Sequence, residues 1–370
     1  MKIKDLCSYA PKSRIKAGEA VENAKYLFFT SSADENKRYT DFQFDKEAII
    51  MGTGGNATLH YYNGKFSVST DCLVLFPNSK IKCKYLYYFF KSHMSVLEAG
   101  FKGAGLKHTN KKYIEEINVS KVPDLTTQEK IVSHLDTITE NIEKLNRELE
   151  LFDSLTKARF IEMFGDPYTN PLKWEKLKIK DAVTVEPQNG LYKPQSDYVT
   201  DRSGIPILRI DGFYDGIVKD FASLKRLKCS ETEKQKYLLL EDDIVINRVN
   251  SIEYLGKCAH IKGLLEDTVY ESNMMRMHFD PETYNSAYIC KLLCSQFIYD
   301  QIVNHAKKAV NQASINQKDV LDFNIYQPPI DLQNQFADFV QQVDKSREEV
   351  KKSLEKTQQL YDSLMQEYFG

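Results

Sequence analysis

The sequence predicts an α+β protein in which two domains with irregular, curved β-sheets alternate with two long helices. Three observations support this fold class. One segment repeats late in the chain, its apolar residues follow a coiled-coil spacing, and the remainder contains short β-type runs. The predicted parts are a first mixed domain, a first helix region, a second mixed domain and a second helix region, at 1–121, 122–165, 166–326 and 327–370.

The repeat establishes an internal pseudo-two-fold organisation. Residues 123–165 align without a gap with residues 328–370 at an offset of 205, and the matches include Gln128 with Gln333. The motif Lys2–Asp5 recurs as Lys178–Asp181 at the smaller offset of 176. The second unit therefore carries about 29 additional residues before its helix.

The apolar residues of both helix regions follow the alternating three- and four-residue spacing of a coiled-coil seam. Arg347 is the one polar break in this spacing. From Thr127 to Met163 a continuous helix would measure ~55 Å, too long to hide its seam except against a matched helix. We therefore expect the two helices to pair as an antiparallel coiled coil through Ile131, Leu135, Ile138, Ile142, Leu145, Leu149, Phe336, Val340, Val343, Val350 and Leu354.

The two mixed domains combine short β-type runs with two helical stretches. The helical stretches lie near 84–99 and 285–304, and Gly, Asn and Asp punctuate the remainder. The predicted strands are Ala48–Met51, Phe66–Ser69, Leu73–Phe76, Pro206–Ile210, Ile244–Ile246 and Met274–Phe279.

Composition limits the classes of protein. Hydrophobic residues make up 42% and charged residues 28%, as in soluble globular proteins. No apolar run approaches the ~18 residues that span a membrane, and the N-terminus has no apolar signal core. The seven cysteines suit buried thiols in a reducing cytoplasm better than a disulfide framework, and the seven histidines show no metal-ligand spacing.

The charge is distributed unevenly along the chain. Residues 1–121 carry 19 basic and 12 acidic side chains, whereas the region 122–165 carries 5 and 9. The second domain, at 166–326, has 21 and 23, and residues 327–370 have 5 and 8. The first domain therefore suits a phosphate-bearing partner, and the acidic helices are expected to face a protein.

The sequence contains no complete catalytic constellation. Gly52–Gly55 is not followed by the Gly-Lys-Ser/Thr of a phosphate-binding loop. Gln327–Ile330 is similar to an amino-methyltransferase site but lacks its aromatic residue, and Pro123–Lys130 lacks the spacing of a nuclease site. We expect a protein that binds without catalysing a reaction or holding a metal.

Several motifs in order resemble the specificity subunits of type I restriction–modification systems. Both helices are entered through Pro-x-x-x-x-Gln, at Pro123–Gln128 and Pro328–Gln333, and both end in an aromatic residue followed by glycine. The stretch Asp243–Ser251, followed by Leu255–Lys257, is similar to a common motif of the family. Further similar stretches are Met51–Gly55, Ser69–Asp71, Lys102–Lys107, Asn189–Lys193, Leu208–Ile210, Ser272–Arg276 and Asn311–Asn316.

The resemblance covers essentially the whole chain and implies a non-catalytic, cytoplasmic DNA-recognition subunit in a prokaryote. The two mixed domains would be target-recognition domains, and each would read one half of a split site in double-stranded DNA. Two adenine methyltransferase (M) subunits, which would bind the S-adenosylmethionine, would dock on the helices. Restriction and motor (R) subunits would join them, and the helices would set the unread spacer.

Residues that could meet base edges or phosphates concentrate in the loops. Arg suits guanine, and Asn or Gln suits adenine. The alternative for each residue is a solvated loop or turn position, and Tyr192 is either stacked on a base or buried. The predicted DNA-binding residues are Thr53, Asn56, Lys102, Lys107, His108, Asn110, Tyr192, Lys193, Arg209, Asn247, Arg248, Asn250, Ser251, Lys307, Lys308, Asn311, Gln312 and Asn316.

Two alternative functions are compatible with the same sequence. In the first, the chain is the specificity partner of a fused nuclease–methyltransferase. In the second, which belongs to a different class, a coiled coil presents two peptide-binding domains. The second alternative leaves the basic first domain and its ordered polar loops without an explanation.

Overall fold

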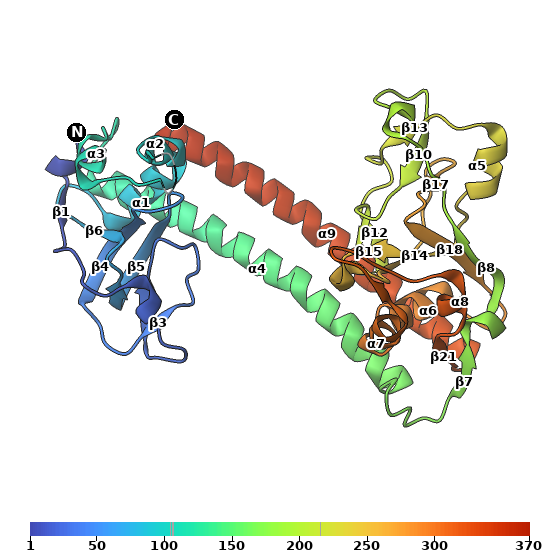
Figure 1. The fold of residues 1–370 in the computed structure, drawn as a ribbon. Coiled ribbons are helices and arrows are strands. Elements are labelled where there is room, and N and C mark those ends of the chain that lie inside the picture. The colour runs from blue at the N-terminus through green and yellow to red at the C-terminus, as the bar shows by residue number, and fades with distance from the viewer. Residues whose placement is uncertain (104, 106, 215) are drawn as a thin grey trace. The chain divides into compact units, whose positions relative to one another are not determined.

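The computed structural model describes residues 1–103, 105, 107–214 and 216–370, and the chain divides into two compact units (Figure 1). The first unit comprises Met1–Glu148 and Val350–Gly370, and the second comprises Leu149–Glu349. Each unit therefore contains one mixed α+β domain together with a part of both long helices.

Both long helices form as the repeat predicts. Helix α4 spans Leu125–Phe164 and α9 spans Ile330–Phe369, 40 residues each, so that both ends keep the offset of 205 (Figure 1). In the first unit His134 Nδ1 lies 3.1 Å from Tyr368 Oη. In the second, Arg347 Nη2 donates to Asp153 Oδ1 at 2.6 Å. Residues late in one helix thus meet residues early in the other, which confirms the antiparallel pairing.

The polar break in the seam has a local partner, because the guanidinium of Arg347 reaches Asp153 on the facing helix. Leu155 and Leu360 are equivalent in the repeat but do not belong to the seam, and 48% and 51% of their surface is exposed. The predicted seam residues are all buried or half-buried: Ile131, Leu135, Ile138, Ile142, Leu145, Leu149, Phe336, Val340, Val343, Val350 and Leu354.

The first unit is built on a curved sheet in the order β1-β6-β4-β5-β2-β3, antiparallel except for the parallel pair β2 and β5. Along β4, Ile49 and Met51 face one hydrophobic cluster while Ala48 and Ile50 face another, as alternation requires. The strands are β1 Cys7–Tyr9, β2 Tyr26–Phe29, β3 Arg38–Tyr39, β4 Phe44–Gly52, β5 Leu59–Val68 and β6 Cys72–Pro77, and the helices are α1 Cys83–Ser92, α2 Met94–Ala99 and α3 Lys111–Glu116.

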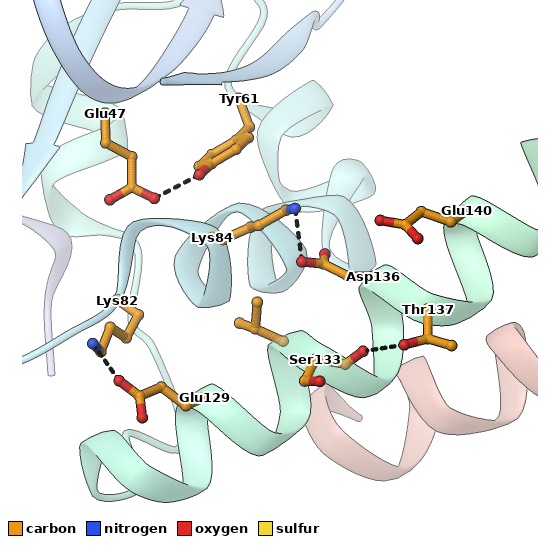
Figure 2. Close-up of a pocket in the computed structure, with 10 residues that line it drawn as sticks. Glu47, Tyr61, Lys82, Lys84, Glu129, Ser133, Asp136, Thr137 and Glu140 are labelled. Atoms are coloured by element: carbon orange, nitrogen blue, oxygen red, sulfur yellow. Dashed lines mark hydrogen bonds and ion pairs between the residues drawn. The ribbon is translucent and has the colours of Figure 1, made fainter. Parts of the chain in front are cut away.

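Helix α4 is fastened to the domain of the first unit by polar contacts around an open cleft of about 530 Å³ (Figure 2). Lys84 Nζ and Tyr88 Oη both donate to Asp136, at 2.7 and 2.6 Å, and Lys82 pairs with Glu129 at 2.5 Å. Paired charges line this cleft, so we assign it to the docking of the helix and not to the recognition of a ligand.

The second unit contains a central sheet in the order β11-β12-β16-β14-β18-β8 and smaller sheets β17-β10-β13-β9, β15-β20-β19 and β21-β7. Its strands are β7 Glu175–Lys178, β8 Val183–Asn189, β9 Tyr198–Val199, β10 Ile205–Leu208, β11 Phe213–Tyr214, β12 Gly216–Val218, β13 Arg226–Leu227, β14 Ile244–Asn247, β15 Val249–Asn250, β16 Cys258–His260, β17 Val269–Tyr270, β18 Met274–Phe279, β19 Lys307–Lys308, β20 Ala313–Ser314 and β21 Asn324–Gln327. Its helices are α5 Glu231–Tyr237, α6 Ser286–Leu293, α7 Gln296–His305 and α8 Gln317–Leu321.

The repeated Lys-Ile-Lys-Asp motif forms the same 3₁₀ turn in both units. Lys2 N donates to Asp5 Oδ2 at 3.3 Å, and Lys178 N donates to Asp181 Oδ2 at 3.4 Å. In both turns the isoleucine, Ile3 or Ile179, is fully buried. The two domains therefore begin with the same anchoring element.

The predicted strand runs coincide with β4, β5, β6, β10, β14 and β18, and the predicted helical stretches with α1–α2 and α6–α7. Within the described residues no helix is both long and apolar enough to cross a membrane. The same residues contain no group of three or more His, Cys, Asp and Glu arranged to hold a metal ion.

Candidate nucleic-acid interface

The loop that follows β4 in the first unit is fixed by hydrogen bonds to two other segments. Thr53 N and Thr53 Oγ1 both donate to Asp71 O, at 2.8 and 3.0 Å. Thr109 N donates to Thr53 O at 3.0 Å and joins this loop to the segment before α3. Thr53 therefore lies where three loops meet.

Lys102 and His108 pair with each other beside that loop. Lys102 and His108 exchange two backbone hydrogen bonds of 3.0 Å, and Gly55 N donates to Lys107 O at 2.9 Å. A Cβ atom at Gly54 would lie 3.2 Å from the ring of His108, so a glycine permits this close approach. Lys102, Lys107 and His108 therefore lie beside the loop after β4.

The candidates that the sequence predicts in the first unit all fall in this loop cluster. Two residues of the predicted stretch Lys102–Lys107, Ala104 and Leu106, lie outside the described residues. Asn110 also has a structural role, because its Oδ1 accepts from Tyr113 N at 3.0 Å and caps α3. The structure brings together Thr53, Asn56, Lys102, Lys107, His108 and Asn110.

The equivalent loop of the second unit follows β14 and contains Arg248. Arg248 N donates to Asn273 O at 2.8 Å, and Ile315 N donates to Arg248 O at 3.0 Å. The guanidinium of Arg248 donates through Nη1 to Ser272 O at 3.1 Å. This hydrogen bond holds the guanidinium beside the loop and leaves it partly exposed.

A hairpin made of β19 and β20 completes the second loop cluster. Lys307 pairs with Ser314, Lys308 pairs with Ala313, and β15 extends the same small sheet through Asn250. The turn of the hairpin exposes Asn311 and Gln312, and the two lysines are also exposed. In the part of the chain that the structure describes, neither lysine forms an ion pair, so both ammonium groups are available to a phosphate.

The two loop clusters share one backbone framework. The bond from Thr53 N to Asp71 O corresponds to that from Arg248 N to Asn273 O, because both residues directly follow a central strand. Two further pairs of bonds match: Thr109 N to Thr53 O with Ile315 N to Arg248 O, and Thr70 N to Ile15 O with Ser272 N to Leu191 O.

Tyr192 is the most exposed aromatic candidate in the second unit, with 77% of its side chain accessible. It directly follows Leu191, whose carbonyl oxygen accepts from Ser272 N at 2.9 Å. An exposed ring at this position could stack on a base, because base–aromatic stacking requires a free ring face.

Several other candidates are engaged within the second unit. Lys193 pairs with Glu233 at 3.0 Å and with Asp197 at 3.6 Å, and the hydrogen bond to Glu233 raises the pKa of this lysine. The side chain of Asn247 is buried, and its amide atoms have no partner among the described residues. Arg209 Nη1 donates to Tyr198 Oη at 3.3 Å, and its Nε lies 3.9 Å from Glu271.

Three polar candidates of the second unit form local turns or caps. The Oδ1 atom of Asn316 accepts from Lys318 N and Asp319 N and caps α8, as Asn110 caps α3. Asn250 Oδ1 accepts from Ser251 N at 2.8 Å, and Ser251 precedes the 3₁₀ turn Ile252–Tyr254. These local bonds fix the loops that carry the more exposed side chains.

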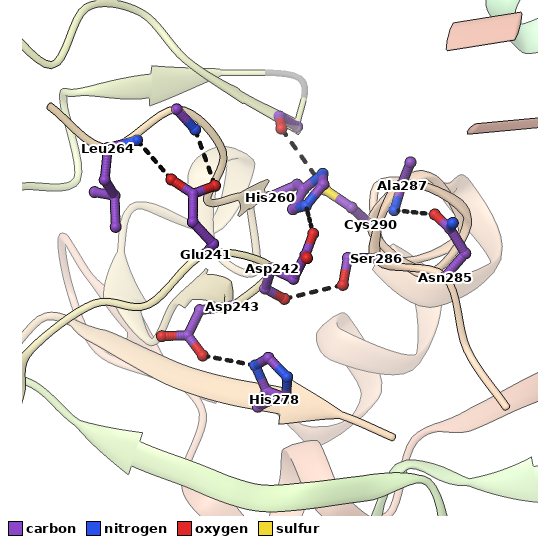
Figure 3. Close-up of polar contacts among 12 residues, drawn as sticks. Glu241, Asp242, Asp243, His260, Leu264, His278, Asn285, Ser286, Ala287 and Cys290 are labelled. Carbon is purple, nitrogen blue, oxygen red and sulfur yellow. Dashed lines mark hydrogen bonds and ion pairs between the residues drawn. The ribbon is translucent and has the colours of Figure 1, made fainter. Parts of the chain in front are cut away.

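Asp243, which directly precedes β14, forms a buried network (Figure 3). Its carboxylate accepts from Leu240 N at 2.8 Å and from Arg276 Nη1 at 3.3 Å, and His278 Nδ1 lies 3.0 Å from Oδ1. Burial raises the pKa of Asp243 despite these favourable partners. The network links β14 to β18, the strand that follows Ser272 and Asn273.

The sequence analysis missed one basic segment beside the first loop cluster. Lys12, Arg14 and Lys16 are exposed, whereas Ser13 is buried and Ile15 is half-buried. The signal available in the sequence was this alternation of basic and non-basic residues.

Comparisons with known proteins identify relatives over nearly the whole chain. A profile of the family described as "Type I restriction modification DNA specificity domain" matches residues 1–151 and 171–359. The chain is 23% identical to the type I restriction enzyme EcoKI specificity subunit of Escherichia coli (strain K12), over 98% of this chain and 77% of that protein. It is also 23% identical to the type I restriction enzyme MjaVIII specificity subunit of Methanocaldococcus jannaschii, over 85% of this chain and 78% of that protein.

A solved structure shares the fold. The crystal structure of the type I restriction–modification system S subunit from M. genitalium superimposes with a TM-score of 0.66 and 15% sequence identity. The match covers 99% of this chain and 94% of that chain. The two mixed domains and the two long helices are therefore an architecture that another protein also adopts.

Proposed function

The chain belongs to the type I restriction–modification DNA specificity family, and from this premise we propose that its two loop clusters each read one half of a bipartite DNA target. The observation that carries the proposal is the shared backbone framework with different side chains. Thr53 occupies in the first cluster the position that Arg248 occupies in the second. A common framework gives both units the same docking geometry, and different side chains give each a different base preference.

We assign catalysis to partners of this chain. An adenine methyltransferase would bind S-adenosylmethionine and modify the DNA, and restriction subunits would cut it in the cytoplasm. The helix regions carry net charges of −4 and −3, so they are poor DNA-binding surfaces and suit protein partners. We infer that two methyltransferase subunits dock on the outward faces of α4 and α9, where Leu155 and Leu360 are exposed.

The helices would also set the distance between the two half-sites. Each is a continuous helix of 40 residues, so its length is about 60 Å at 1.5 Å per residue. A helix pair would keep the spacer near a constant length, because a helical segment is a stiffer spacer than a flexible linker.

A fused nuclease–methyltransferase partner would use the same surfaces of this chain. It would differ from separate methyltransferase and restriction subunits only in that one polypeptide would both cut and methylate the DNA. The peptide-binding scaffold is not favoured, because the family profile covers both domains and describes DNA specificity.

Genome-wide mapping of methylated adenines tests the proposal. The chain would be expressed with its methyltransferase partner, and the modified adenines would be located in the host DNA. We expect one bipartite motif with a constant gap, and no methylation or cutting by the purified chain alone. A single uninterrupted motif, or methylation by the chain without partners, would contradict the proposed division of labour.

A further inference from the structure

The segment Lys12–Lys16 carries cations that the DNA-binding candidates do not include. Lys12, Arg14 and Lys16 are exposed, and within the described part of the chain none of them forms an ion pair. Ser13 is buried and Ile15 is half-buried, so the residues between the cations face the domain. The three cations are therefore accessible to a ligand from solvent.

This segment is held in place by side-chain and backbone bonds. Ser13 Oγ accepts from Ile15 N at 3.1 Å and from Gln43 Nε2 at 2.9 Å. Gln43 Oε1 in turn accepts from Val68 N at 2.9 Å, which ties the segment to the end of β5. The cations are thus presented by an ordered backbone, so less entropy is lost when they bind a ligand.

The same segment adjoins the first loop cluster directly. Thr70 N donates to Ile15 O at 2.8 Å, and the next residue, Asp71, is the acceptor for both Thr53 N and Thr53 Oγ1. The residue before Lys16 is thus connected to Thr53, a predicted base-reading position, through the adjacent residues Thr70 and Asp71. A duplex that reaches Thr53 would present its phosphates to this edge, because B-DNA carries one charge per ~1.7 Å of helix axis.

The position equivalent to Lys16 in the second unit is occupied by a different kind of side chain. Ser272 N donates to Leu191 O as Thr70 N donates to Ile15 O, and the pair Ile15 and Leu191 keeps the offset of 176 set by the repeated N-terminal motif. Lys16 is therefore equivalent to Tyr192. Where the first unit has three free cations, the second has an exposed ring followed by Lys193, which Glu233 and Asp197 neutralise.

We propose that Lys12, Arg14 and Lys16 form a phosphate-binding edge of the first recognition site, and that this edge makes the first unit the main electrostatic anchor on DNA. The inference rests on the proposed function. It assigns the larger share of the sequence-independent binding strength to the first unit. In the second unit Lys307 and Lys308 remain available to phosphates, but the edge equivalent to Lys12–Lys16 contributes an aromatic surface.

The test measures the salt dependence of DNA binding by the complex of the full chain with its methyltransferase partner. The variant Lys12→Gln/Arg14→Gln/Lys16→Gln would be compared with Lys25→Gln/Lys80→Gln/Lys121→Gln. The control makes the same change in charge at exposed lysines that precede β2, follow β6 and precede α4. The complexes of both variants would be titrated with a duplex that carries the mapped motif and with a scrambled duplex. The salt concentration would vary between about 50 and 200 mM.

We expect the negative slope of log K against log salt to become shallower by roughly 1–3 in the test variant, since each phosphate contact contributes about −0.9 to it. Affinity should fall on both duplexes, the preference for the motif should persist, and the control should match the unchanged protein. Arg14→Lys should retain the slope because it retains the charge.

The two hypotheses fail in different ways. An unchanged slope in the test variant, while the unchanged protein still prefers its motif, would overturn the phosphate-binding edge alone. A loss confined to the motif duplex would also overturn it, because it would indicate base reading. If the unchanged protein showed no preference for the motif, the proposed function itself would be wrong.

Discussion

The side chain of Gln333 makes in the second unit the same hydrogen bonds that the side chain of Gln128 makes in the first. Gln128 Oε1 accepts from Lys82 N at 2.8 Å, and Gln333 Oε1 accepts from Asn285 N at 2.9 Å. In both cases the donor is the residue that precedes a helix of the domain, α1 or α6. The Nε2 groups donate to two carbonyl oxygens in each unit, those of Lys80 and Pro123 and those of Thr283 and Pro328.

We expect Gln128→Leu and Gln333→Leu to destabilise their own units. Both glutamines are fully buried, so leucine would leave buried backbone groups without partners, at a cost of about 1–3 kcal/mol for each group. Denaturant unfolding of each variant and of the double variant would measure the loss. Gln335→Leu, at an exposed position of α9, is the control and should change little. A neutral Gln128→Leu would show that this residue does not fix the start of α4.

Asp243→Ala should be among the most destabilising substitutions in the second unit. The carboxylate is fully buried and contacts Arg276 and His278. Its removal deprives two partially buried side chains, a guanidinium and an imidazole, of their carboxylate partner. Loss of one partner of a buried pair typically costs about 3–5 kcal/mol. Asp243→Asn should cost less because it keeps the shape of the side chain. Thermal unfolding at neutral pH would rank the two, and equal, small losses would mean that the network is not structural.

The pH dependence of the same site has a defined sign. Burial raises the pKa of Asp243, so the folded state binds its proton more tightly than the unfolded state does. Its contribution to stability is therefore fully present below the unfolded pKa and is lost as the pH rises through the folded pKa. As the pH rises across that window, the free energy of unfolding of the unsubstituted protein should fall relative to that of Asp243→Asn. Denaturant unfolding at a series of acidic pH values would measure the difference.

Leu145→Asp and Leu155→Asp should separate the two faces of α4. Leu145 is half-buried in the seam, so a carboxylate there should lower the melting temperature and weaken assembly with the methyltransferase. Leu155 is exposed, so Leu155→Asp should leave folding intact and reduce only the binding of the methyltransferase. Circular dichroism and co-purification report the two properties. Full assembly and full stability in Leu145→Asp would refute the paired seam.

The long helices could be predicted because an apolar seam sustained over many turns identifies a helix pair. Short strands such as β15 and β20 could not, since two residues carry no period and pair only through contacts distant in sequence. Asn110 and Asn316 were recognisable as loop residues, but their capping role depends on where α3 and α8 begin. Lys193 shows the same limit: the sequence indicates a cation, and only the fold brings Glu233 to it.

Arg248→Ala should weaken binding to the mapped motif by about 1–3 kcal/mol if its guanidinium meets a guanine edge. The loss should be confined to the half-site read by the second unit, because Arg248 belongs to that loop cluster alone. Arg226→Ala removes an arginine that Glu266 already pairs at 2.7 Å, and it serves as the control. Binding assays with duplexes altered in one half-site at a time would locate the effect. An equal loss on random DNA would assign Arg248 to phosphate contact.

The last prediction concerns the spacing of the half-sites. Seven residues inserted into each helix, near Asn146 in α4 and near Lys351 in α9, preserve the heptad register of the seam. Each insertion adds ~10 Å at 1.5 Å per residue, which corresponds to about three base pairs at ~3.4 Å each. The loop clusters around Thr53 and Arg248 are unchanged by the insertions. The bases read at each end should therefore stay the same while the gap between them widens.

Mapping the adenines that the lengthened complex methylates would reveal the new gap. A seven-residue insertion in α4 alone is the matched control, because it shifts the pairing of the helices and should abolish assembly. If the folded, active complex kept the original gap after both insertions, the spacing would have to be set by the methyltransferase subunits. A wider gap between unchanged half-sites would make α4 and α9 the element that measures the DNA.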